Sequence, residues 1–196
     1  MKKSFLAGIA GLALVVSLSS CDKLPQEKVD AAVAALDSAK LAEAELYVPE
    51  LLAQVQDSLN AAQNNIETQK SKMFANYDVV RTQLDGVVAM AADVKVKAAE
   101  RKEAVKQEIV AVIAEVAAVV TENNELIKKA PRGKEGASAL EAIKTDLAGV
   151  EAAIAEGQTA YDGGVYVPTL DKVKAAKDKA LSINAELKAA IEKKKK

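Results

Sequence analysis

The sequence predicts an all-α protein, an elongated helical bundle or coiled coil with a long central helix and two αα-hairpin corners. Three observations support this fold class. Ala, Glu, Lys, Leu and Val dominate the 196 residues and only 3% are aromatic, a composition typical of long helices. Apolar residues recur at alternating intervals of three and four, as on one face of an α-helix. Proline, which disrupts helix interiors, occurs only four times.

The N-terminal segment has the pattern of an export signal. A cationic start at residues 1–3 precedes an apolar run at 5–16, which is shorter than the roughly 20 residues that span a bilayer. The run ends in a tetrapeptide that resembles the bacterial lipobox, made of Leu18, Ser19, Ser20 and Cys21. The resemblance implies a diacylglycerol on Cys21 and cleavage before it by the lipoprotein signal peptidase. An uncleaved signal anchor and an ordinary secretory signal are the alternatives.

The lipobox would place the protein in the bacterial cell envelope. Residues 1–20 would be the signal peptide, and residues 21–24 a short lipidated tether that faces the periplasm. Two or three acyl chains make a stable membrane anchor, whereas one does not. Asp22 resembles the inner-membrane retention signal of enteric bacteria, but other bacteria do not follow that rule. Both the inner and the outer membrane therefore fit the sequence.

The first helix is expected from about Pro25 to Leu46. Proline is tolerated in the first helical turn. An apolar stripe with alternating three- and four-residue spacing follows, formed by Ala32, Ala35, Ala39, Ala42 and Leu46. Because alanines allow helices to approach closely but bury little area, we expect a slim bundle.

Residues 50–130 contain no proline and a single glycine, Gly86. We expect one long helix here, which would measure about 120 Å at 1.5 Å per residue. A break at Asn76-Tyr77-Asp78 or at Asp85-Gly86 is the alternative. The apolar stripe consists of Leu52, Val55, Leu59, Ala62, Ile66, Met73, Tyr77, Val80, Leu84, Val87, Ala91, Val94, Ala98, Val105, Ile109, Val112, Val116 and Val119.

A loop at residues 130–136 separates a region at 25–130, expected to be a helical hairpin with the long helix, from a C-terminal helical hairpin at 131–196. Ser138 and Glu141 form an S-x-x-E pattern that predicts a capping box at a helix start. The stripe of this helix comprises Leu140, Ile143, Leu147, Val150 and Ile154, and glycines 157–164 are expected to end it. The last helix should begin at Pro168.

One short motif occurs twice. Tyr47-Val48-Pro49 recurs as Tyr166-Val167-Pro168, each time between two expected helices. A residue before proline prefers an extended conformation, so we interpret both copies as helix–helix corners covered by the tyrosine. An old duplication of an αα-hairpin or chance recurrence explains the repeat.

Composition argues against most catalytic chemistry. The chain has no His and one Cys, so it lacks an imidazole base, a Cys–His pair and an ordinary zinc site. The number of Lys and Arg residues (27) nearly balances that of Asp and Glu (28), so the chain has no net positive charge that would attract nucleic acid. Carboxylates are scattered over polar helix faces, as in the i,i+4 pair Asp93 and Lys97. We expect no enzyme activity, no cofactor, no metal site and no nucleic-acid partner.

The two ends of the chain resemble Braun-type lipoproteins, in which an acylated N-terminal Cys and a coiled coil lead to a C-terminal Lys joined to peptidoglycan. The resemblance makes Lys196 a candidate attachment point, although Lys-Lys-Lys precedes it where that family has an aromatic and a basic residue. The chain also resembles other helical periplasmic lipoproteins. The leading hypothesis is a structural or scaffold protein that binds a protein partner or itself through helix seams, with residues 111–120 as one candidate. Peptidoglycan binding is the alternative.

Overall fold

Every regular element in the computed structural model is a helix in residues 22–132 and 134–195, the part of the chain that the structure describes. The expected all-α class is therefore confirmed. The elements are α1 (Gln26–Leu41), α2 (Ala44–Tyr47), α3 (Pro49–Lys70), α4 (Asp78–Lys129), α5 (Lys134–Asp162) and α6 (Val167–Lys195).

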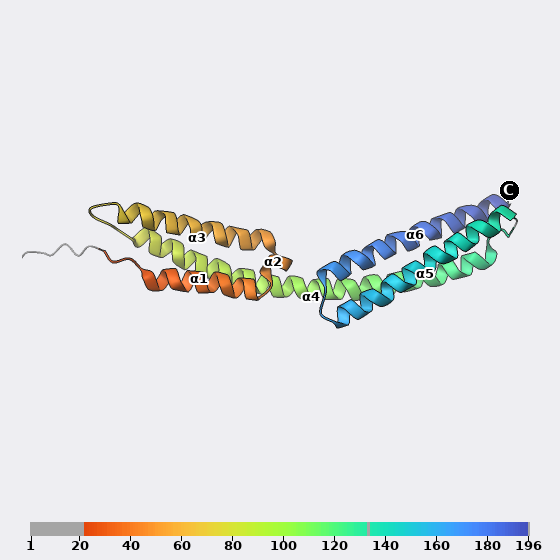
Figure 1. Ribbon diagram of the computed structural model, residues 1–196, viewed down its shortest axis with the longest axis horizontal. Coiled ribbons are helices and arrows are strands. Elements are labelled where there is room, and N and C mark those ends of the chain that lie inside the picture. The colour runs from red at the N-terminus through yellow and green to blue at the C-terminus, as the bar shows by residue number, and fades with distance from the viewer. Residues whose placement is uncertain (1–21, 133, 196) are drawn as a thin grey trace, which may run out of the picture.

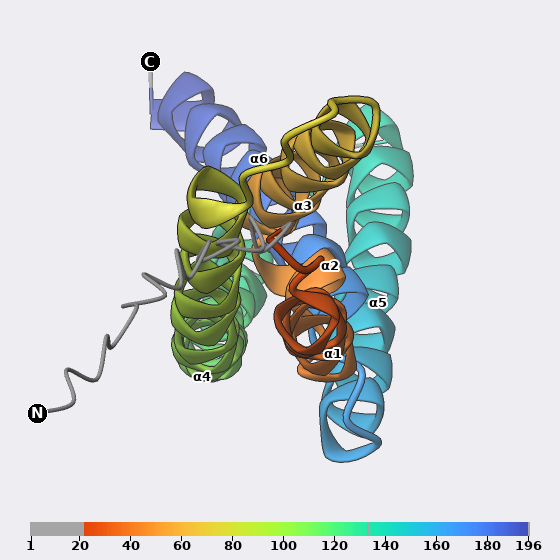
Figure 2. The same cartoon turned by 90° about the vertical axis from the view of Figure 1, so that its left-hand side faces the viewer.

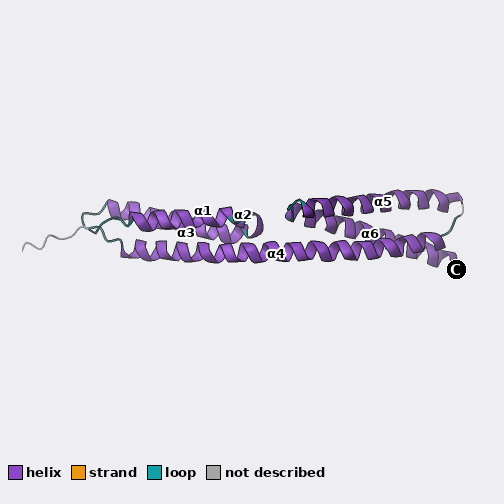
Figure 3. Ribbon diagram, turned by 90° about the horizontal axis from the view of Figure 1, so that it is seen from below, coloured by secondary structure: helices purple, strands orange, loops and turns teal. Residues whose placement is uncertain are grey.

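The helices form two bundles placed end to end along α4. Helices α1 and α3 pack on the N-terminal half of α4, and α5 and α6 pack on its C-terminal half (Figures 1 and 3). Figure 2 shows the molecule end-on, with the N-terminal bundle toward the viewer. With 52 residues, α4 is about 78 Å long at 1.5 Å per residue. The expected long central helix is thus present, and it runs along the length of an elongated molecule.

The expectation of one helix across residues 50–130 is wrong, and the alternative break near Asn76-Tyr77-Asp78 is correct. Helix α3 ends at Lys70 and α4 begins at Asp78. The Asn76 side chain accepts a hydrogen bond of 2.8 Å from the Asp78 backbone N–H, an Asx turn that starts α4. Folding α3 back on α4 buries both apolar stripes, whereas a single helix would leave them exposed to water.

The first helix is also shorter than expected. Helix α1 ends at Leu41, and Glu43 adopts a left-handed conformation with φ 59° before α2 begins. That conformation costs a non-glycine residue about 1–2 kcal/mol, and the break allows Ala44 and Tyr47 to turn inward and become buried. Leu46, expected in the seam, is instead 48% exposed.

The start of α5 differs from the expected capping box. The helix begins at Lys134, so Ser138 lies inside it rather than at its N-cap. Pro131 does not open a helix; it follows Ala130, whose extended backbone ends α4. Gly136 lies against Pro131, where an added Cβ would come within 2.5 Å of the proline carbonyl oxygen. This close approach fixes the first turn of α5 upstream of the serine.

The expected apolar stripes form the core. In α4 the buried stripe residues are Val80, Leu84, Val87, Ala91, Val94, Ala98, Val105, Ile109, Val112 and Val116. The stripe of α3 is buried in the same way, and the buried apolar residues of α6 are Leu170, Val173, Ala176, Ala180, Ile183 and Leu187. Met73, expected in the long stripe, lies in the turn after α3 and is 85% exposed. Within residues 111–120, Val112 and Val116 face the C-terminal bundle, so the apolar character of this segment serves mainly as core.

Two close contacts hold the C-terminal bundle together. The buried Asn184 amide donates to the Asn123 side-chain oxygen at 2.8 Å, and the Asn123 amide donates to the Ala180 carbonyl at 2.9 Å. Gly157 of α5 lies against α6, where an added Cβ would be 2.8 Å from the side chain of the buried Val173. The hydrogen bonds of Asn123 and Asn184 thus set the spacing of α4 and α6, and Gly157, which has no side chain, sets the spacing of α5 and α6.

Within the described residues, none of the helices has a continuous apolar stretch sufficient to cross a membrane.

Candidate functional site

The repeated motif brings two tyrosines to the middle of the molecule. Tyr47 is the last residue of α2 and Pro49 the first of α3, while Tyr166 directly precedes α6, which contains Pro168 in its first turn. Both motifs are therefore located at the inner ends of their hairpins, where the two bundles meet on α4. We name the group Glu43, Tyr47, Lys102, Lys106, Tyr161 and Tyr166 the central junction.

Lys102 of α4 lies between the two copies of the motif. Its Nζ is 5.8 Å from the ring centroid of Tyr47 and also 5.8 Å from that of Tyr166. Lys106, one turn further along α4, lies 5.8 Å from the same Tyr166 ring. Cation–π contacts of this kind contribute about 0.5–1 kcal/mol each at exposed sites. One ammonium group therefore joins an aromatic ring of the N-terminal bundle to one of the C-terminal bundle.

The left-handed Glu43 completes the arrangement. Its carboxylate forms an ion pair with Lys102, so the break between α1 and α2 supplies the counter-charge to the ammonium. On the other side, Tyr161 packs edge-on against Tyr166 with centroids 5.4 Å apart. Aromatic pairs favour this geometry. The central junction is thus a stack of rings and charges that bridges both bundles.

The pKa shifts of Lys102 and Tyr47 in the central junction do not favour acid–base chemistry near neutral pH. The hydrogen bond that the Lys102 ammonium donates to the Glu43 carboxylate raises the pKa of Lys102, which keeps this side chain charged. Burial raises the pKa of the Tyr47 hydroxyl, which keeps it neutral. A nucleophilic lysine or a tyrosine base needs shifts in the opposite direction. These groups are suited to binding one another.

A second group lies at the end of the molecule where the described chain begins, and we name it the anchor clamp: Asp22, Tyr77 and Arg81. The Asp22 carboxylate accepts a hydrogen bond of 2.7 Å from the Tyr77 backbone N–H and two from the Arg81 guanidinium, one of them at 2.9 Å. A paired arginine–carboxylate contact of this kind fixes geometry as well as charge. The hydrogen bonds from Arg81, followed by that from Tyr77, hold the pKa of Asp22 below its usual value.

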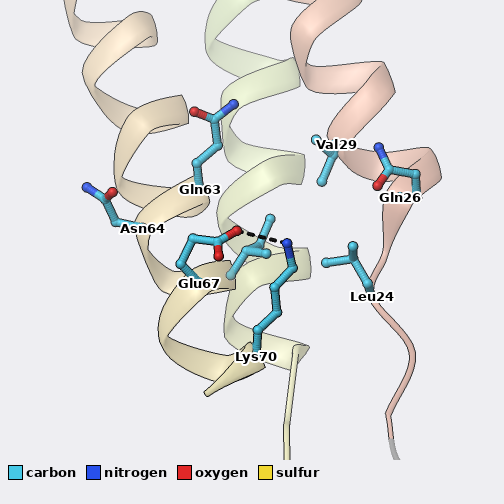
Figure 4. Close-up of a pocket in the computed structure, with 8 residues that line it drawn as sticks. Leu24, Gln26, Val29, Gln63, Asn64, Glu67 and Lys70 are labelled. Atoms are coloured by element: carbon cyan, nitrogen blue, oxygen red, sulfur yellow. Dashed lines mark hydrogen bonds and ion pairs between the residues drawn. The ribbon is translucent and has the colours of Figure 1, made fainter. Parts of the chain in front are cut away.

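A shallow groove of about 370 Å³ lies near the anchor clamp, between the start of α1 and the end of α3 (Figure 4). Leu24 and Val29 supply apolar surface from one side. Glu67 and Lys70 form an ion pair of 2.8 Å on the other side. The groove is lined by Leu24, Gln26, Val29, Gln63, Asn64, Ile66, Glu67 and Lys70. This lining combines apolar contacts with side-chain amides and one ion pair.

The remaining predicted site residues lie outside the described residues. These are the lipobox residues Leu18, Ser19, Ser20 and Cys21 and the candidate attachment residue Lys196. The Asp93–Lys97 ion pair is present at 2.8 Å. Within residues 22–132 and 134–195, no three carboxylate or thiol side chains gather in a way that would hold a metal ion.

Sequence reasoning identified the two tyrosine corners but missed Lys102, Glu43 and Arg81. Each is a charged residue on a helix that is rich in such residues, so no local pattern distinguishes it. The recurrence of Tyr-Val-Pro was the one available signal that two distant segments share a role.

Comparison of the chain with protein-family models, with curated proteins and with solved structures found no match.

Proposed function

We propose that this protein is a lipid-anchored spacer and scaffold of the bacterial cell envelope, facing the periplasm and without a catalytic step. The single observation that carries the proposal is the position of its two ends. Asp22, the residue after the lipobox Cys21, is bound to the start of α4 by Arg81. The C-terminal end of α6 lies at the opposite end of the molecule (Figure 1). A membrane anchor at one end would therefore hold the other about 78 Å away, the length of α4.

The internal construction supports a spacer. One uninterrupted helix connects the two bundles, and the central junction braces them where the flanking hairpins meet. Ion pairs on the surface link α6 to α4, including Lys174–Glu108 and Lys188–Glu122. Each exposed pair is worth little alone, but their distribution along the helices resists sliding. A braced rod transmits position better than a flexible tether.

The lipid anchor is tested by mass spectrometry of the mature protein from membranes. We expect an N-terminus at Cys21 that carries the mass of a diacylglycerol and an additional acyl group. The variant Cys21→Ser should accumulate as the uncleaved precursor. A mature N-terminus at another residue, or an unmodified Cys21, would refute the anchor.

The scaffold role is tested by photo-crosslinking in intact envelopes. A photoreactive residue replaces the exposed Val96 or Val110 of α4, and a matched variant carries it at the buried Val105. We expect discrete crosslinked products from the exposed positions and none from the control. If neither exposed position yields a discrete product, these faces of α4 bind no partner and no second copy.

A peptidoglycan tether is the second candidate, because the C-terminal end of α6 lies at the end of the molecule opposite to the start of the described chain (Figure 3). Deletion of residues 193–196 should release the protein from purified sacculi if the lysines bind the wall. Lys196→Arg separates the two possible modes, since it keeps the charge but removes the primary amine. Loss of retention in this variant indicates a covalent link, whereas unchanged retention of the deletion variant excludes wall binding through the tail.

A further inference from the structure

The turn between α3 and α4 exposes two large apolar side chains side by side. Met73 is 85% exposed and Phe74 is 74% exposed. The chain contains only one other phenylalanine, Phe5, which lies in the expected signal peptide. An isolated exposed apolar residue is common in proteins. Two adjacent ones at the tip of a turn, including the only phenylalanine after the lipobox, indicate a surface that is covered in the assembled state.

The turn itself is well hydrogen-bonded. The backbone N–H of Lys72 donates to the Gln69 carbonyl at 3.0 Å, and that of Asn76 donates to the Gln69 side chain at 3.3 Å. With the Asx turn at its end, the segment has a defined conformation. Met73 and Phe74 are therefore presented outward by an ordered turn.

The anchor clamp brings this turn next to the lipidation position. Asp22 is bonded to the Tyr77 backbone, and Phe74 precedes Tyr77 by three residues, which span at most about 11 Å. Cys21 is one residue from Asp22, about 3.8 Å away between Cα atoms. The exposed pair thus lies at the same end of the molecule as the proposed acyl chains. Figure 1 shows the turn at the end where the described chain begins, and Figure 2 views that end directly.

The charges around the turn suit a bilayer surface. Lys23 and Lys72 are exposed, and within the described residues no carboxylate pairs with either of them. The nearby carboxylates of Glu67 and Asp78 are paired with Lys70 and Arg81. The two lysines would therefore be attracted to a membrane with anionic lipids, by about 1 kcal/mol each near its surface. Two side chains alone bury too little area for a stable dimer, which requires about 800 Å² per partner. The setting therefore favours a lipid surface over a second copy of the chain.

We propose that Met73 and Phe74 insert into the headgroup region of the membrane beside the acylated Cys21, as a second lipid contact that orients the rod. This inference rests on the proposed lipid anchor. Because Asp22 is fixed to α4, the acyl chains would attach to the rod at a single point, and a single point of attachment leaves the tilt of the rod undefined. A second contact, fixed to α4 through the anchor clamp, defines it.

The test uses Phe74→Trp in the full acylated protein, which otherwise contains no tryptophan. The protein is reconstituted into vesicles of phosphatidylethanolamine and phosphatidylglycerol, with and without bromine on the acyl chains. The reference sample is the same variant without its acyl chains, in buffer free of detergent. We expect the indole at position 74 to emit at shorter wavelength in vesicles than in this reference. We also expect its emission to be weaker in brominated vesicles than in unbrominated ones. The matched control is Val165→Trp, next to Tyr166 of the central junction, where the native side chain is 49% exposed.

Equal quenching at positions 74 and 165 would overturn the proposal. A second result would also overturn the proposal. If the emission at position 74 shifts to shorter wavelength with increasing protein-to-lipid ratio, and brominated lipids do not quench it, the indole contacts a second copy of the protein and not the bilayer. Mass spectrometry of the same sample reports on the anchor separately. If Cys21 carries no acyl group, the proposed function fails, while quenching at position 74 on added vesicles still decides this inference.

Discussion

Replacing Lys102 with methionine should destabilise the protein by about 1–2 kcal/mol. The change removes the ammonium but keeps an unbranched apolar stem that packs as before. Two cation–π contacts, with Tyr47 and Tyr166, are lost, at about 0.5–1 kcal/mol each. The ion pair with Glu43 is more than one-third exposed on both sides, and it adds a few tenths of a kcal/mol at most. The aromatic contacts therefore account for most of the expected loss.

The measurement is urea unfolding followed by circular dichroism at 222 nm. Lys95→Met on the same helix is the matched control, because the described structure gives Lys95 neither an ion pair nor an aromatic contact. We expect this control to stay within about 0.5 kcal/mol of the parent protein. Double-mutant cycles of Lys102→Met with Tyr47→Leu and with Tyr166→Leu should each give a coupling of about 0.5–1 kcal/mol.

Two results would contradict this reasoning. If Lys102→Met and Lys95→Met are equally stable, the ammonium contributes nothing at the central junction. If only the cycle with Tyr47 shows coupling, Lys102 belongs to the N-terminal bundle alone and does not bridge the two. Added salt offers a further check, because it weakens the exposed ion pair and should leave the coupling with the rings nearly unchanged.

Three further predictions concern the packing and the anchor clamp. Asn184→Leu should lower the free energy of unfolding in urea by about 1–3 kcal/mol, because it leaves the buried oxygen of Asn123 without a donor. Replacing both asparagines with leucine should recover most of that loss. If the double variant recovers nothing, the shape of the two side chains matters and their hydrogen bond does not. Gly157→Ala should lower stability relative to Gly149→Ala by about 1–3 kcal/mol, since the first overpacks α5 against α6 and the second has nothing within 4 Å of the new Cβ; equal melting temperatures would refute the close approach. The lowered pKa of Asp22 stabilises the fold fully above the unfolded value, near 3.8, and this stabilisation is lost as the pH falls through the folded value. Hydrogen exchange should therefore report faster opening of the turn before α4 at low pH, and Asp22→Asn should abolish that dependence.

The regular parts of the fold followed from apolar spacing, and the breaks did not. The stripe from Val80 to Val116 was predicted in register because burial in a helical bundle needs little more than one apolar face. The turn after α3 was harder to predict, since Met73 and Tyr77 continue the same spacing through it. The break at Glu43 occurs in a run of strong helix formers. Its left-handed backbone is compensated by a partner distant in sequence, which a local pattern cannot reveal.

The candidate sites show the same division. The repeated Tyr-Val-Pro motif indicated two corners, and both are at helix ends. The two tyrosines come together at Lys102 because of the lengths of α1 and α5, which both end near the middle of α4. The proximity of Asp22 to Arg81 depends on the turn after α3. Sequence spacing predicts which face of a helix is buried, whereas these meetings arise from where helices stop.

The continuity of α4 has a mechanical consequence. Among the described helices only α4 runs through both bundles, and α6 lies parallel to its C-terminal half (Figure 3). A pulling force applied between Asp22 and the lysine-rich end of α6 would enter α4 directly through the Asp22–Arg81 contact. It would leave by shear along the α4–α6 interface, where many contacts are loaded at once. Forced unfolding is governed by the rate at which such contacts yield together. The molecule is therefore built to carry tension along its axis, and it would open far more readily if its hairpins were peeled sideways.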